Sequence, residues 1–139
     1  MRAIKVLQFR QPAYIERLWS GLVKAGVPEF PCGYSSKEQL TGEQVRVLVF
    51  GHKFRGRSLD SGEPYRRITT ADGAAEVTVG AAVPNGSSWI DGDFLCSLWH
   101  TDLDATCAAI IRNPAGTREA QNEYLVVLWG ERTEFSVVK

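Results

Sequence analysis

The sequence has no net charge, because its 16 lysine and arginine residues are balanced by 16 aspartate and glutamate residues. A neutral chain has no overall field that would steer it to nucleic acid or to an acidic membrane. The sequence also lacks a run of 18 apolar residues, and its first ten residues lack the apolar core of a secretory signal. We therefore expect a cytoplasmic protein, with neither nucleic acid nor membrane as a partner.

Residues that build metal, redox and catalytic sites are scarce as well. The two histidines, His52 and His100, have no neighbours at metal-ligand spacing, so we expect no bound metal and no cofactor. No serine lies in a nucleophile motif, which argues against an enzyme. The three cysteines, Cys32, Cys96 and Cys107, form no CxxC pair, which is typical of free thiols in a reducing compartment.

Residues 1–39 are interpreted as a helix followed by a linker arm. Pro12 is suited to the first turn of a helix, and Gly26 stands where a helix commonly ends. Between them the apolar residues recur at helical spacing, at Ile15, Leu18, Trp19, Leu22 and Val23. This stripe is far in sequence from the rest of the fold, so we expect it to pack on the following domain or to pair two copies of the chain as a homodimer.

A second, shorter helix is expected after residue 40. Thr41 and Gln44 have the spacing of a capping box at its start, and Gly51 ends it. Apolar residues cover much of its surface, at Val45, Val47, Leu48, Val49 and Phe50. This composition predicts a well-buried helix.

From His52 onward the apolar residues alternate with a period of two, which is typical of strands. Eight strands are expected, over residues 53–58, 65–70, 76–79, 88–90, 94–99, 107–111, 124–129 and 134–138. No helix separates them, so the sheet should be antiparallel. The fold class is therefore α+β, mainly antiparallel β: an up-and-down, lipocalin-like barrel or half-barrel of 7–8 strands preceded by two helices, with residues 40–139 as its domain.

The central hairpin turns at an Asp-Gly-Asp sequence, residues 91–93, and its second strand runs from Phe94 to Trp99. If the next turn has two residues at its tip, Cys96 lies directly opposite Cys107, and a longer turn would separate them. We predict two adjacent thiols that can bridge on oxidation but stay reduced in the cell, with Cys32 as the unpaired third.

Two stretches resemble known bacterial sequences. The segment FRQPAYIERLWSGLVKAGVPE, residues 9–29, is similar to the end of the tetratricopeptide region in class III adenylate/guanylate cyclase-like proteins. The segments LTGEQVR at residues 40–46, GEPY at 62–65 and WIDGDFLC at 89–96, together with Cys107, resemble a bacterial β-domain of uncharacterised activity. That β-domain occurs in secreted proteins and at the tail of some cyclase-like chains.

The resemblance implies an accessory or sensory module rather than a catalyst, because the paired metal-binding aspartates of a cyclase domain are absent. It carries over no site residues, since the activity of the β-domain is not known to us. The resembled β-domain also has cysteines at the two strand positions, often in exported proteins, which favours their proximity.

The candidate ligand-binding residues are basic and aromatic. Two arginine pairs, Arg55 with Arg57 and Arg66 with Arg67, lie on consecutive strands and could hold an anion together, although a solvated edge balanced by acidic residues would give the same pattern. Aromatic residues could line a ligand cavity or simply fill a small barrel. The candidate set is Arg55, Tyr65, Arg67, Trp89, Trp99 and Tyr124.

Three functions remain open from the sequence. The first is a non-catalytic accessory or sensory module that binds a small anionic or aromatic ligand. The second is a protein-interaction or dimerisation module that uses the helix from Pro12 to Gly26. The third is an α+β cone enzyme of the cystatin/nuclear-transport-factor type, which shares the order of helix and strands.

Overall fold

The computed structural model of the chain describes residues 20–22, 24–26, 36–113, 123–128 and 131–139. The apolar stripe of the first expected helix lies mostly outside these residues, as do Cys32 and Trp129. The docking of that helix, the homodimer and the boundary after residue 39 therefore stay predictions.

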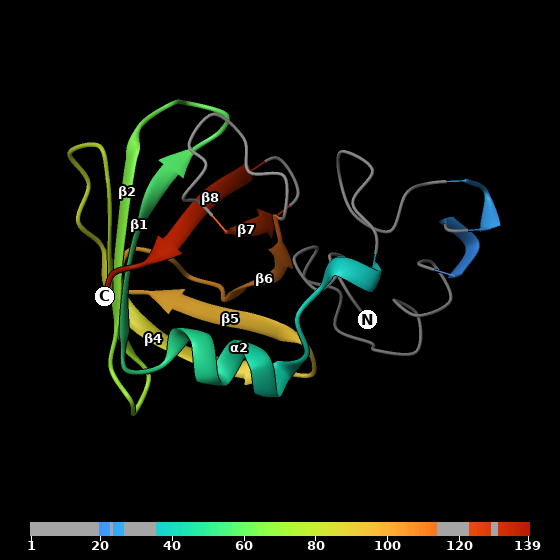
Figure 1. Cartoon of the computed structure of the whole chain (residues 1–139), viewed down its shortest axis with the longest axis horizontal. Coiled ribbons are helices and arrows are strands. Elements are labelled where there is room, and N and C mark those ends of the chain that lie inside the picture. The colour runs from blue at the N-terminus through green and yellow to red at the C-terminus, as the bar shows by residue number, and fades with distance from the viewer. Residues whose placement is uncertain (1–19, 23, 27–35, 114–122, 129–130) are drawn as a thin grey trace.

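The described strands form one closed antiparallel barrel in which each strand pairs with its neighbours in the sequence (Figure 1). β1 pairs with both β2 and β8, and this second pairing closes the sheet. The strands are β1 (His52–Ser58), β2 (Pro64–Thr69), β3 (Ala74–Val79), β4 (Asn85–Asp91), β5 (Phe94–Trp99), β6 (Thr106–Arg112), β7 (Tyr124–Leu128) and β8 (Glu131–Val137). The expected antiparallel barrel is confirmed, whereas a half-barrel or an open cone is not what forms.

The helical segments nearest the barrel are η3 (Ser36–Glu38) and α2 (Gly42–Val49), and residues 20–22 and 24 are helical as well. The predicted capping box at α2 is present, since Thr41 and Gln44 each bond the other's backbone N–H. The backbone N–H of Gly42 donates to the Asp93 carboxylate at 2.8 Å, which fixes the start of α2 to the turn between β4 and β5. The helix therefore lies across one end of the barrel (Figure 1).

The expectation that α2 is buried over much of its surface is wrong. Val45 and Val49 are buried inside the barrel end, but Val47 is 68% exposed. The cause is that α2 contacts β1, β4 and β5, so only one side of the helix faces the sheet. The opposite side faces open space at the same barrel end.

The half of the barrel nearest α2 is filled by side chains. Phe54 and Phe135 pack with ring centroids 4.7 Å apart, and Tyr124 stacks on Phe135 at 5.5 Å. With Val45 and Val49 these rings belong to the apolar core, whose burial supplies most of the stabilisation of a small barrel. The other half of the barrel is left less completely filled.

A second apolar cluster lies on the outer wall of β5, β6 and β7. Its buried members are Phe94, Cys96, Ala109, Ile111, Leu125 and Val127. Cys96 and Cys107 are direct cross-strand partners, as predicted, and they form a disulfide in this structure. The expected two reduced thiols are therefore not what the structure contains.

The disulfide closes a loop whose ends are 11 residues apart. Loop-closure entropy predicts that such a bond stabilises the fold by about 3 kcal/mol relative to the reduced chain. We therefore expect dithiothreitol to lower the melting temperature of the wild-type protein by several degrees. The double variant Cys96→Ser/Cys107→Ser should melt at the lower temperature with or without reductant. If the melting temperature of the wild-type protein is the same with and without reductant, the disulfide is contradicted.

Candidate functional site

One line of polar side chains points into the barrel from β2. Along this strand, burial alternates residue by residue, and the buried members are Tyr65, Arg67 and Thr69. Alternation places these three on one face of the strand. Because β2 is part of a closed barrel, that face is the interior, and Arg67 keeps only 5% of its surface exposed.

Arg67 is held by hydroxyl groups from three strands. Its Nε donates to Oγ1 of Thr69 at 3.0 Å. Its Nη2 donates to Oγ of Ser88 at 2.7 Å and to Oγ of Ser97 at 3.2 Å. Ser88 and Ser97 are direct partners across the β4–β5 hairpin and lie 2.9 Å apart. This arrangement orients the guanidinium inside the barrel.

Aromatic groups complete the surroundings of this guanidinium. The Cζ of Arg67 lies 5.4 Å from the ring centroid of Trp99, a cation–π distance. The Tyr65 hydroxyl is close enough to interact with Arg67. Burial raises the pKa of Tyr65, and the neighbouring positive charge and hydrogen bond of Arg67 act in the opposite direction. The phenol is therefore a proton-bearing group beside the guanidinium at neutral pH.

A cavity of about 610 Å³ lies in the half of the barrel that faces away from α2, and Tyr65, Arg67, Ser97 and Trp99 are among the residues that line it. Its walls are mostly apolar, and the residues that form them include Val77, Val79, Leu95, Ala108, Val126 and Leu128. Its mouth is surrounded by the β1–β2 connection and the starts of β6 and β8, which contribute Asp60, Glu63, Thr106 and Glu131. The cavity therefore combines apolar walls with one deeply placed cation.

Arg67 has no acidic partner among the described residues. Its hydrogen bonds all go to neutral hydroxyls, and neither of the ion pairs in the described chain involves it. These hydroxyl groups accept from the Nε and Nη2 donors, but as neutral groups they leave the positive charge uncompensated. A buried cation at the wall of a mostly apolar cavity is an electrostatic arrangement that favours an anion.

A second arginine, Arg57, differs from Arg67 in having an acidic partner. It lies on the outer wall, where its Nη2 is 3.2 Å from the Glu134 carboxylate. Glu134 is fully buried, so this pair has charge compensation that Arg67 lacks. The two arginines therefore allow a comparison between a half-buried cation with an acidic partner and a buried cation that has none among the described residues.

The structure brings together only three of the six predicted site residues. Tyr65, Arg67 and Trp99 line the same cavity. Arg55 is exposed and pairs across strands with Arg66, which is also exposed. Arg67 is buried in the interior, so the structure places Arg55 and Arg67 on opposite faces of the barrel wall. Trp89 lies on the outer face opposite Cys96 and is 40% exposed. Arg55 and Trp89 lie outside the cavity because successive residues of a strand face opposite sides of the barrel wall.

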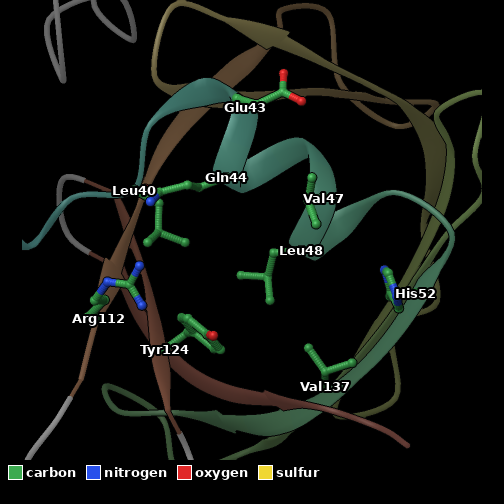
Figure 2. A pocket seen from close by; sticks show the side chains of 9 residues that line it. All are labelled: Leu40, Glu43, Gln44, Val47, Leu48, His52, Arg112, Tyr124 and Val137. Atoms are coloured by element: carbon green, nitrogen blue, oxygen red, sulfur yellow. The ribbon is translucent and has the colours of Figure 1, made fainter.

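Tyr124 belongs to a different, smaller pocket of about 360 Å³ at the α2 end (Figure 2). This pocket lies between the open side of α2 and the strands that face it. Its lining residues are Leu40, Glu43, Gln44, Val47, Leu48, His52, Arg112, Tyr124 and Val137. His52 and Arg112 are both exposed to solvent. The pocket holds no buried charged group, and the larger cavity is therefore the stronger candidate site.

Three residues that matter for the site were missed from the sequence: Thr69, Ser88 and Ser97. A signal for two of them was present. The Asp-Gly turn predicts the register that makes Ser88 and Ser97 partners, and two paired hydroxyls on the inward face of a hairpin require a polar neighbour. What the sequence does not indicate is that Arg67 is this neighbour.

The described chain carries few other features that bear on function. It contains no group of three or more His, Cys, Asp or Glu side chains placed to hold a metal ion. No helix among these residues is long and apolar enough to cross a membrane. The cavity around Arg67 thus remains the main feature with recognisable binding chemistry.

The chain matches no protein-family model, no curated protein and no solved structure.

The uncompensated charge of Arg67 predicts an unusual mutational effect. Arg67→Met removes the cation, and the methionine side chain fills much of the volume that the arginine occupied. Ser88 and Ser97 keep their mutual hydrogen bond. We expect the free energy of unfolding of the unliganded protein to rise by about 1 kcal/mol in urea denaturation, since replacing buried charge by apolar groups is often stabilising.

Arg57→Met is the matched comparison, and it should lower the free energy of unfolding instead of raising it. It leaves the buried Glu134 carboxylate without its partner, which costs about 3 kcal/mol. Similar destabilisation by both substitutions would mean that Arg67 is a structural residue with its charge already compensated.

Proposed function

We propose that this protein binds a small amphipathic molecule whose anionic group, a carboxylate, sits against Arg67. The observation that carries the proposal is the guanidinium inside the barrel, bonded only to neutral hydroxyls and facing an apolar cavity. A ligand carboxylate would supply the missing negative charge. Arginine is well suited to this role because its planar fork can bond both carboxylate oxygens.

The dimensions of the barrel support a ligand of limited size. Eight-stranded up-and-down barrels such as lipocalins have an interior that can hold one small ligand. The cavity volume of about 610 Å³ is within the range of small-molecule sites. The lipocalin-like character expected from the sequence is part of this proposal.

The surrounding groups favour a carboxylate with an apolar body. The protonated Tyr65 hydroxyl can donate a hydrogen bond to an anion beside Arg67, and its raised pKa keeps this donor available at neutral pH. Away from these groups the walls are apolar, at Val77, Leu95 and Val126 among others. A hydrocarbon chain attached to the carboxylate would bury its surface there.

The resemblance to the tail of cyclase-like proteins fits a binding role without catalysis. We propose that the barrel serves as a ligand-responsive accessory module, as that resemblance implies. The cavity supports this proposal because it presents an oriented cation and apolar walls, which are groups that bind a ligand. A dimerisation role for the helix of residues 12–26 has no comparable observation in its favour.

Decanoate and decanol test the proposal because they share an apolar body and differ in charge. We expect isothermal titration calorimetry to show that wild-type protein binds decanoate more tightly than decanol. Arg67→Met should weaken decanoate binding about 10- to 100-fold, the usual effect of losing hydrogen bonds to a charged group, and should change decanol binding by less than threefold.

Arg66→Met provides the control, because Arg66 is the adjacent arginine on the same strand but points outward. It should leave the affinity for decanoate unchanged. Equal affinities of the wild-type protein for decanoate and decanol, or equal loss in the Arg66 and Arg67 variants, would contradict the proposal.

A further inference from the structure

The mouth of the cavity carries negative charge that the described chain does not balance. Three carboxylates line it, from Asp60, Glu63 and Glu131. The Asp60 carboxylate is bound by Arg132, whose Nη2 lies at 3.0 Å, and the hydrogen bonds of Arg132 lower the pKa of Asp60. Neither of the other two has a basic partner among the described residues.

Glu63 is fixed near the mouth by its own loop. One of its carboxylate oxygens accepts a hydrogen bond from the Ser61 hydroxyl at 3.3 Å, which is a neutral partner. The backbone of Glu63 is tied to β1, since its carbonyl accepts from the N–H of Ser58 at 2.9 Å. Ser58 in turn pairs with Thr133, two residues after Glu131. The two uncompensated carboxylates therefore stand at the same end of the barrel, on segments joined through β1.

The positive and negative ends of the cavity are separated along the barrel. Glu63 precedes Arg67 by four residues, and an extended chain of that length spans about 13 Å. The interior thus has a cation at its depth, apolar walls between, and two carboxylates at its mouth. A simple monoanion would meet the field of these carboxylates on entering and would leave them uncompensated once bound.

We propose that the ligand is bipolar: an anionic group bound to Arg67, an apolar linker, and a cationic group at the mouth near Glu63 and Glu131. This inference rests on the proposed carboxylate site and adds the charge of the other end of the ligand. A cationic end matches the mouth, a neutral end is tolerated, and a second anionic end is repelled. The ligand class is therefore a zwitterion with separated charges, such as an ω-amino acid.

Three ligands with the same ten-carbon body separate these cases: ω-aminodecanoate, ω-hydroxydecanoate and decanedioate. Each has a carboxylate at one end, and the other end is cationic, neutral or anionic. We expect calorimetry at low salt to rank their affinities in that order, with the ω-amino acid about three- to tenfold tighter than the ω-hydroxy acid, the effect of one or two partly exposed ion pairs. The advantage should shrink in high salt.

The double variant Glu63→Gln/Glu131→Gln should bind all three ligands with affinities within about twofold of one another. Glu76→Gln is the control, because Glu76 is an exposed carboxylate on the outer face of β3, and it should leave the ranking unchanged.

Two outcomes overturn the inference and leave the carboxylate site intact. One is that the ω-amino and ω-hydroxy acids bind equally well to the wild-type protein and both depend on Arg67. The other is that the double variant retains the full preference for the amine. The expected result is that the wild-type protein shows the ranking and that Arg67→Met weakens the binding of the ω-amino and ω-hydroxy acids about 10- to 100-fold. No binding of any of the three acids would reject both the inference and the proposed function.

Discussion

The pairing of β1 with β8 is the constraint on which the rest of the structure depends. It joins the first and last strands of the meander and turns one face of every strand into an interior. The two backbones approach closely at Gly56, where a Cβ atom would lie 1.8 Å from the carbonyl oxygen of Glu134. Without this contact β2 would have a solvated face, and Arg67 would be an ordinary exposed arginine.

Closure divides the interior into two halves with different roles. At the α2 end, the aromatic contacts of Phe54, Tyr124 and Phe135 fill the barrel and give it a packed core. At the other end, the wall residues leave a cavity whose polar groups are oriented by hydrogen bonds across three strands. The packed half supplies apolar burial, and the other half holds a buried cation that has no acidic partner among the described residues.

Much of the barrel could be predicted from the sequence because turns and alternation are local. The Asp-Gly turn determines the β4–β5 register, and with the next turn it places Cys96 opposite Cys107. The capping box at Thr41 is equally local. Alternation also separates the two faces of each strand, but it does not say which face is inside. On β2 the polar face is the buried one, while the apolar Ile68 is 42% exposed. Hydrophobicity alone would therefore place the outward face of this strand in the interior. Only the pairing of β2 with β1 and β3 settles the assignment.

We infer that Arg67, a buried cation with no acidic partner among the described residues, receives the anionic end of a ligand. A crystal structure of the protein with ω-bromodecanoate tests it most directly, because the bromine marks one end of the chain by its anomalous scattering. The account predicts a carboxylate within hydrogen-bonding distance of the Arg67 guanidinium and a bromine near the mouth, beside Glu63 and Glu131. A bromine deep in the barrel with the carboxylate in solvent, or a chain bound only outside the barrel, would contradict it.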